Sequence, residues 1–265
     1  MKQRIITAII FGAILIPVVI YGGTPVVLLA YVLAAAALFE VLKMRRLKML
    51  SVPGIITLAL LWGLMLPDGA QEWPALQFAA GSKTEIGMLA VLLLLTYTVA
   101  SKNRFTFDDA AFSILASVYV GIGFYYFIET REAGILFIFF SLFIVWATDS
   151  GAYFIGKAMG KNKLWPEISP NKTVEGFIGG VVCAVAVAVL FVLLTDIDAT
   201  LLQLTFITFV LSIFGQIGDL AESALKRHYE VKDSGTILPG HGGILDRFDS
   251  LLFVWPLLHF FQLLN

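Results

Sequence analysis

The chain has little charge and almost no cysteine for its length. Only 14% of its 265 residues are Asp, Glu, Lys or Arg, whereas 59% are hydrophobic. A water-soluble domain usually has about 25% charged residues, so this composition excludes that class of protein. Cys183 is the only cysteine, which excludes an internal disulfide and a cysteine-rich metal site. The net charge of −1 gives no reason to expect a nucleic-acid partner, and we expect none.

Most of the sequence consists of long apolar runs. A helix needs about 20 apolar residues to cross a bilayer. The runs predict an all-α, polytopic transmembrane bundle with about nine spans, of which the third and sixth are the shortest. These spans lie near residues 5–21, 26–42, 52–66, 86–100, 110–128, 134–148, 173–194, 201–225 and 248–264. The first run is longer than the apolar core of a secretory signal, which favours a membrane span there.

The distribution of Lys and Arg predicts the orientation, because cytoplasmic loops retain cations. With nine spans and a cytoplasmic N-terminus, every Lys and Arg except Lys83 and Arg131 falls on the cytoplasmic side. We therefore expect a multi-pass protein of the cell inner (plasma) membrane whose polar loops face the cytoplasm. Residues 1–130 have short loops and are expected to form a scaffold with dimer contacts. Residues 131–265 are expected to form the catalytic half, with cytoplasmic loops at 150–172 and 226–249.

The end of the eighth predicted span carries a polar stripe. Asp219, Glu222, Ser223 and Lys226 follow i, i+3, i+4, i+7 spacing, which places them on one face of a helix. Asp219 is next to small residues inside an apolar span, so we expect a bound cation or Lys226 beside it. A purely structural ion pair, from Asp219 or Glu222 to Lys226, is the alternative.

The segment GHGGILDRFD indicates an anion site next to a metal site. Gly240, Gly242 and Gly243 let backbone amides approach an anion, and His241 can donate to a phosphate. If a helix begins near Ile244, Asp246 and Asp249 lie one turn apart on one face. Mg²⁺ characteristically takes one or two carboxylates together with phosphate oxygens. An acidic first turn that stabilises the helix dipole explains one aspartate but not both.

The preceding polar loop offers a second anion site. Ser169 followed by Pro170 predicts the start of the seventh span, whose first amides and Lys172 would bind an anion. Asp149 interrupts an apolar span and is either a metal ligand or the partner of Lys157. Lys157, Lys161 and Lys163 fit a topological role as well as a catalytic one.

These residues together favour metal-assisted transfer at phosphorus on a lipid substrate. Their order also resembles the signature of the phosphatidate cytidylyltransferase (CDP-diglyceride synthase) family. The resemblance is carried by Ser223-x-x-Lys226-Arg227, Lys232-Asp233, Pro239-Gly240-His241-Gly242-Gly243-x-x-Asp246-Arg247-x-Asp249 and, upstream, by the segments 148–153 and 169–176. The motifs are long and specific and cover the C-terminal half. Val174 departs from the tryptophan common in the family.

The resemblance implies that CTP and phosphatidic acid give CDP-diacylglycerol and pyrophosphate in a homodimer among membrane lipids. It implies Mg²⁺, which a second cation can join, held by Asp219, Asp246 and Asp249 with Asp149 in support. Catalysis would use these three aspartates with Lys226 and Arg227. Substrate phosphates would be held by Ser223, Lys232, His241, Gly242, Gly243, Arg247, Asn171 and Lys172.

Two other classes of protein are open alternatives. A CDP-alcohol phosphotransferase resembles D-G-x-x-A-R followed by G-x-x-x-D-x-x-x-D, and this chain has neither that motif nor that aspartate spacing. An ion-coupled transporter would bury its carboxylates near midspan on interrupted helices, whereas the charges here gather at the cytoplasmic ends of the predicted spans.

Overall fold

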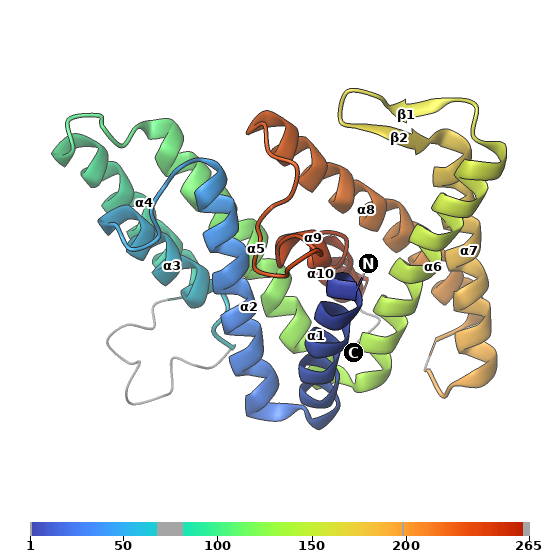
Figure 1. Cartoon of the computed structure of the whole chain (residues 1–265). Helices are drawn as coiled ribbons and strands as arrows, with labels where there is room; N and C mark the ends of the chain where they lie inside the picture. Colours follow the sequence, from blue (N-terminus) through green and yellow to red (C-terminus); the bar gives the residue numbers. More distant parts are fainter. Residues whose placement is uncertain (1, 68–81, 198, 262–265) are drawn as a thin grey trace. The chain divides into compact units, whose positions relative to one another are not determined.

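The computed structural model describes residues 2–67, 82–197 and 199–261, and it is a helical bundle with one small hairpin (Figure 1). The helices are α1 (Lys2–Tyr21), α2 (Gly23–Met44), α3 (Val52–Leu64), α4 (Lys83–Ala100), α5 (Phe107–Ala133), α6 (Ile135–Met159), α7 (Val174–Leu194), α8 (Leu201–His228), α9 (Leu245–Phe248) and α10 (Leu251–Phe260). The strands are β1 (Lys163–Trp165) and β2 (Ser169–Thr173). The predicted fold class, a helical membrane bundle, is confirmed.

Helix length separates six strong candidates for membrane spans from three weaker ones. Within the described residues, α2 and α4 to α8 are long and apolar enough to cross a bilayer. The shorter apolar helices are Ile6–Tyr21 of α1, α3 and α10. The third predicted span is short, as expected, but the sixth corresponds to a helix of 25 residues. The ninth is divided between α9 and the 10-residue α10, and its last residues lie outside the described ones. The count of nine and the orientation stay predictions.

The chain forms two compact units. Unit 1 comprises Met1–Gly23 and Glu129–Asn265, and unit 2 comprises Thr24–Ile128. The first helix therefore belongs with the C-terminal half of the chain. Whether catalysis and dimer contacts divide between residues 1–130 and 131–265 stays a prediction.

Unit 2 is built from capped helices around a small apolar core. Ser51 caps α3 by accepting the Gly54 amide, and Ser82 and Glu85 form a reciprocal capping box at the start of α4. Leu94, Phe105 and Ala110 are buried together in this unit. Between α2 and α5, Nε of Arg45 lies 2.6 Å from Oδ1 of Asp109.

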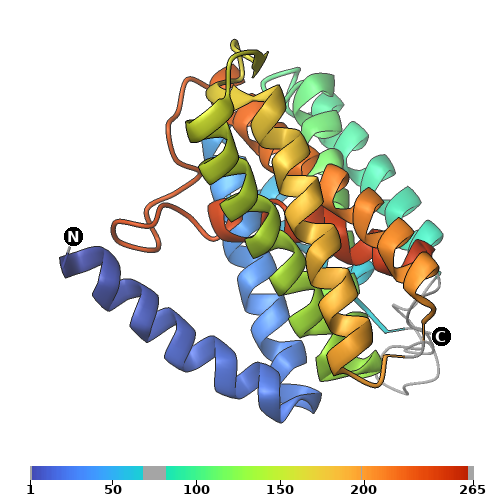
Figure 2. The same ribbon diagram turned by 90° about the vertical axis from the view of Figure 1, so that its right-hand side faces the viewer.

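Unit 1 is organised by close packing of α6 on α7, which run side by side (Figure 2). A Cβ added at Gly180 would lie 2.7 Å from the carbonyl of Thr148, and one at Gly176 would lie 2.7 Å from that of Ala152. Small residues allow such backbone approach, which drives helix association where lipid removes the hydrophobic gain. Gly151 on α6 similarly faces Cys183, the small core residue of α7.

The predicted start of the seventh span at Ser169 is wrong. Ser169–Thr173 pairs as β2 with β1 in an antiparallel hairpin, and α7 begins at Val174 with Thr173 as its N-cap. Pro170 is tolerated because a two-stranded hairpin has only edge strands. The polar loop is also shorter than predicted, because α6 continues to Met159. Residues 160–173 therefore form a hairpin that projects from the ends of α6 and α7 (Figure 1).

Two cations at helix ends have intramolecular partners. In unit 1, Nε and Nη2 of Arg131 donate to the carbonyls of Val19 and Ile20, at 2.5 and 2.9 Å. Gly22 follows with φ of 79°, and a Cβ there would clash with the same guanidinium. In unit 2, the ammonium of Lys83 lies 3.4 Å from the centre of the Tyr125 ring.

Candidate functional site

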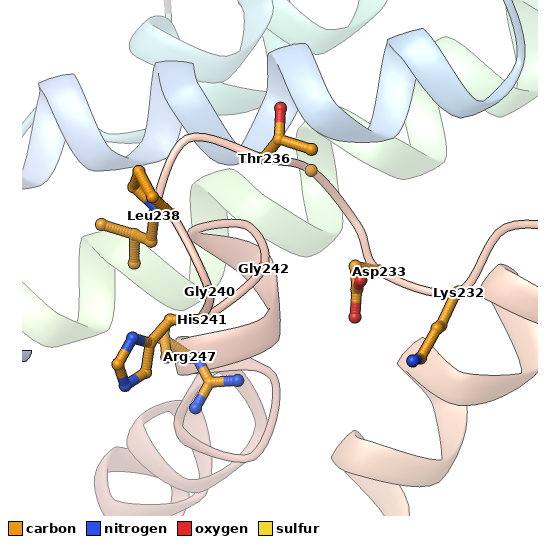
Figure 3. Close-up of a pocket in the computed structure, with 10 residues that line it drawn as sticks. Lys232, Asp233, Thr236, Leu238, Gly240, His241, Gly242 and Arg247 are labelled. Atoms are coloured by element: carbon orange, nitrogen blue, oxygen red, sulfur yellow. The ribbon is translucent and has the colours of Figure 1, made fainter. Parts of the chain in front are cut away.

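The loop between α8 and α9 folds around a polar cavity of about 410 Å³ (Figure 3). Lys232 and Asp233 line one part of it, and His241, Gly242 and Arg247 line another. A tight turn closes the loop, because the Leu238 amide donates to Gly242 at 3.0 Å and the His241 amide donates to Leu238 at 2.8 Å. Three cation-capable side chains thus surround one cavity, which suits an anion.

Gly240 and Gly242 make this turn possible. Their φ angles are 79° and 85°, in the left-handed region that favours glycine. A Cβ at Gly242 would also lie only 2.4 Å from Oδ2 of Asp246. Any side chain at this position would therefore strain the backbone and displace the carboxylate.

Asp246 is the centre of a hydrogen-bond network that holds the loop. Its Oδ2 accepts from the Ser234 amide at 2.9 Å, the Ser234 hydroxyl at 2.8 Å and the Gly243 amide at 2.8 Å. Its Oδ1 accepts from Nζ of Lys226 at 2.7 Å. Burial opposes ionisation of Asp246, but the Gly243 amide and the Lys226 ammonium lower its pKa to about 2. A carboxylate offers about four acceptor positions, so protein groups already occupy those of Asp246.

Lys226 connects this loop to α8. Its ammonium also contacts Oε2 of Glu222, one helical turn away, at 2.5 Å. Glu222 is 2% exposed, and its Oε1 has no hydrogen-bond partner within the described part of the chain. The pair from Glu222 to Lys226, which the spacing offered as a structural alternative, is therefore present.

A second cavity, of about 420 Å³, lies among α6, the hairpin, α7 and α8 and has both polar and apolar lining residues. Asp149, Asn171, Lys172 and Asp219 line it. Nζ of Lys172 lies 2.5 Å from Oδ2 of Asp219, and the Ser223 hydroxyl donates to Oδ1 at 3.4 Å. The expected partner of Asp219, Lys226, is thus replaced by Lys172, because the hairpin brings Lys172 to α8.

Three aspartates of unit 1 act on one another electrostatically. Asp249 is half-buried, and Asp219 and Asp149 are close enough for their charges to act on its carboxylate. Gly218 lets α8 lie close to the chain at Asp249, because a Cβ at position 218 would lie 2.6 Å from the carbonyl oxygen of Asp249. Across residues 2–67, 82–197 and 199–261, however, no group of three His, Cys, Asp or Glu side chains is placed so that it could hold a metal ion by itself.

The predicted site residues thus fall into two neighbouring groups within unit 1. One is the loop cavity with Asp246 and Lys226, and the other is the carboxylate cavity with Asp219 and Ser223. Arg227 is exposed and its Nε donates to the carbonyl of Ile168, at 3.3 Å. Asp149 has no ion pair with Lys157, whose ammonium lies 5.9 Å from the centre of the Tyr153 ring.

Sequence reasoning missed three residues that shape the site. Ser234 is buried and binds Asp246 through both its amide and its hydroxyl. Gln216 lines the carboxylate cavity and donates to the carbonyl of Phe177, at 3.2 Å. Glu222 was assigned to the polar stripe but not to the site, although its i, i+4 spacing to Lys226 was a usable signal.

Apolar helices whose charged residues gather around two cavities are typical of a polytopic membrane protein with a polar functional site. Residues 2–264 match the model of the cytidylyltransferase family. The chain is 54% identical to the phosphatidate cytidylyltransferase of Bacillus subtilis (strain 168) over 263 residues, which are 98% of this chain and 97% of that protein. It is 51% identical to the Staphylococcus haemolyticus (strain JCSC1435) enzyme of the same name over 261 residues, 98% of each chain. The chain belongs to the cytidylyltransferase family.

Proposed function

We propose that this chain transfers the cytidylyl group of CTP to phosphatidic acid, giving CDP-diacylglycerol and pyrophosphate. A phosphate oxygen of the lipid bonds to the α-phosphorus of CTP, and the bond from that phosphorus to the bridging oxygen of the β-phosphate breaks. The lipid phosphate is already an anion, so the step needs no strong general base. Its barrier comes mainly from bringing two polyanions together, which cationic groups lower.

The observation that carries this proposal is the arrangement at the end of α8. Asp219 lines the carboxylate cavity and accepts a hydrogen bond from Ser223. One turn beyond Ser223 on the same helix, Lys226 pairs with Asp246, whose hydrogen bonds order the loop around the other cavity. Two cavities that are linked through α8 and that both contain cations suit a reaction between two phosphate-bearing substrates. The relatives named phosphatidate cytidylyltransferase supply the identity of those substrates.

Mg²⁺ fits the carboxylate cavity better than the loop cavity. Asp149 and Asp219 line this cavity and offer hard oxygen donors, and Asp249 is close enough for their charges to act on it. When bound there, Mg²⁺ would neutralise charge on the reacting phosphates. Asp246 was also assigned to metal, but its acceptor positions are filled, so we assign it to ordering the loop. A second cation and the homodimer belong to this proposal as predictions.

The cationic side chains would act on the phosphates directly. Lys232, His241 and Arg247 line the loop cavity, and Asn171 and Lys172 line the other. The ammonium of Lys172 pairs with Asp219 at the cavity and can also bind a phosphate there. Arg227 is exposed beside the hairpin and can reach an anion at the cavity entrance. By the charge bias, all of these groups face the cytoplasm.

The test is pyrophosphate release by the purified full chain in vesicles, with CTP and phosphatidic acid varied separately. We expect release that requires both substrates. Lys172→Gln should reduce kcat/KM by about 100-fold, the usual effect of losing one preorganised charge donor. Lys163→Gln in β1, outside both cavities, is the matched control and should stay near wild type. CMP release from CDP-diacylglycerol and an alcohol, or no release of pyrophosphate, would contradict the proposal.

A further inference from the structure

Unit 2 contains a cavity whose lining residues have no role in the transfer reaction proposed above. It has a volume of about 500 Å³ and lies between the connection from α2 to α3 and the connection from α4 to α5. Four cationic side chains line it, two from each connection: Arg46, Lys48, Lys102 and Arg104. All four residues are exposed.

The backbone of both connections takes a conformation in which glycine is normally preferred. Arg46 and Lys102 have φ of 61° and 55°, just after the last turns of α2 and α4. The Leu47 amide then donates to Leu42, and the Asn103 amide donates to Thr98, each at 2.9 Å, which closes the helix ends. A long cationic side chain at a left-handed position carries a conformational cost, and such outliers concentrate at functional sites.

The charge at this cavity is not neutralised by the protein. Within the described part of unit 2, none of the four cations forms an ion pair, whereas neighbouring Arg45 pairs with Asp109. The helix dipoles do not neutralise these four cations either. The C-terminal ends of α2 and α4 contribute about −0.5 charge each, and the N-terminal ends of α3 and α5 about +0.5 each, so the dipoles roughly cancel.

Apolar residues lie within and beside the cavity as well. Phe105 and Pro53 are buried beneath the cations, and Tyr97 is half-buried beside them. On adjoining turns of the chain, Leu50 is 90% exposed and Val99 is 79% exposed. A topological role explains why these loops contain cations. It does not explain why four of them meet around one cavity that apolar residues also line.

We propose that this cavity binds the phosphate of an anionic phospholipid headgroup, with the acyl chains against the adjoining apolar residues. The ligand chemistry is that of a phosphate-bearing anion. The apolar residues within and beside the cavity identify a lipid as its source. None of its lining residues lines either of the two cavities of unit 1.

The experiment measures binding of fluorescent phosphatidylglycerol to the purified full chain in neutral detergent. Lys48→Gln with Lys102→Gln removes two cations of the cavity. The matched control, Lys43→Gln with Lys163→Gln, removes two exposed lysines that do not line it. Each cation near a membrane surface contributes about fivefold in affinity, so the double variant should bind about 25-fold more weakly. The control should stay within about twofold of wild type, and all three proteins should unfold at the same temperature because the substitutions are exposed.

Two further results decide the proposal. Equal affinities of the double variant and its control would overturn it, because the cations would then act only through the general surface potential. Inorganic phosphate is the second probe. If it displaces the labelled lipid as effectively as unlabelled phosphatidylglycerol does, the cavity binds a soluble phosphate and the lipid assignment is wrong.

Discussion

Replacing Asp246 by Asn should loosen the loop between α8 and α9 rather than merely weaken a metal site. The amide keeps one oxygen, which can stay with Ser234 and Gly243. Its NH₂ group then faces the Lys226 ammonium at the position where Oδ1 lay 2.7 Å away. A donor thus meets a donor, although Lys226 keeps Glu222 as a partner.

The expected cost of this substitution is about 3 kcal/mol. Hydrogen bonds to a charged acceptor contribute about 1.5 to 3 kcal/mol, and breaking a buried ion pair costs about 3 to 5 kcal/mol. The Asp246 side chain is 7% exposed and that of Lys226 is 15% exposed, so solvent compensates little. A cost of 3 kcal/mol corresponds to about a 100-fold increase in local opening of the loop.

The assay is hydrogen exchange of the backbone amides of residues 230–243 in the purified, membrane-embedded chain. Asp233→Asn is the matched control: it makes the same chemical change in the same loop at an exposed carboxylate. Exchange should accelerate about 100-fold in Asp246→Asn and stay near wild type in Asp233→Asn. If both variants exchange at the same rate, the loop does not depend on Asp246 and our reasoning fails.

Three other measurements test the site and the topology. Asp249→Asn should remove most pyrophosphate release without faster loop exchange, since Asp249 bonds to the Ser250 amide and not to the loop; near-normal turnover at saturating Mg²⁺ would reject it as a ligand. Because the pKa of Asp246 lies near 2, below its ordinary value, its stabilisation should be complete above about pH 4 and be lost as the pH falls through 2. After correction for the intrinsic pH dependence of amide exchange, the rates of wild type should show this loss and those of Asp246→Asn should not. In a Cys183→Ala background, single cysteines at Arg45, Lys161 and Lys232 should label from one side and one at Lys83 from the other; labelling of positions 83 and 161 from the same side would refute the orientation.

Hydropathy predicted the helices well because a bilayer requires every backbone group to be paired within its own segment. That requirement is local, so runs of apolar residues locate α2, α4, α5, α7 and α8 within a few residues of their ends, whereas α6 continues 11 residues beyond its predicted end at residue 148 because its last turns carry polar residues. The pair between Glu222 and Lys226 was foreseeable for the same reason, because it spans one helical turn. The polar motif within residues 223–249 also identified the family.

The contacts that define the site could not be predicted, because they join distant parts of the chain. Nothing in the sequence near Ser169 indicates a strand, because β2 is stabilised by pairing with β1 rather than by its own composition. Lys172 reaches Asp219, 47 positions away, only because that hairpin forms. Ser234 and Asp246 meet through a loop whose shape depends on two left-handed glycines.

The contacts of Arg131 and Lys83 give a physical reason for the two exceptions to the charge bias. A cation that caps carbonyls at the end of α1, or that lies on an aromatic ring, keeps its charge but is held by its own protein and is less available to bind the phosphates of anionic lipid. Such residues should count for less in any tally of topogenic charge. Neutralising Arg131 should therefore detach the end of α1 and leave the direction in which the chain threads the bilayer unchanged.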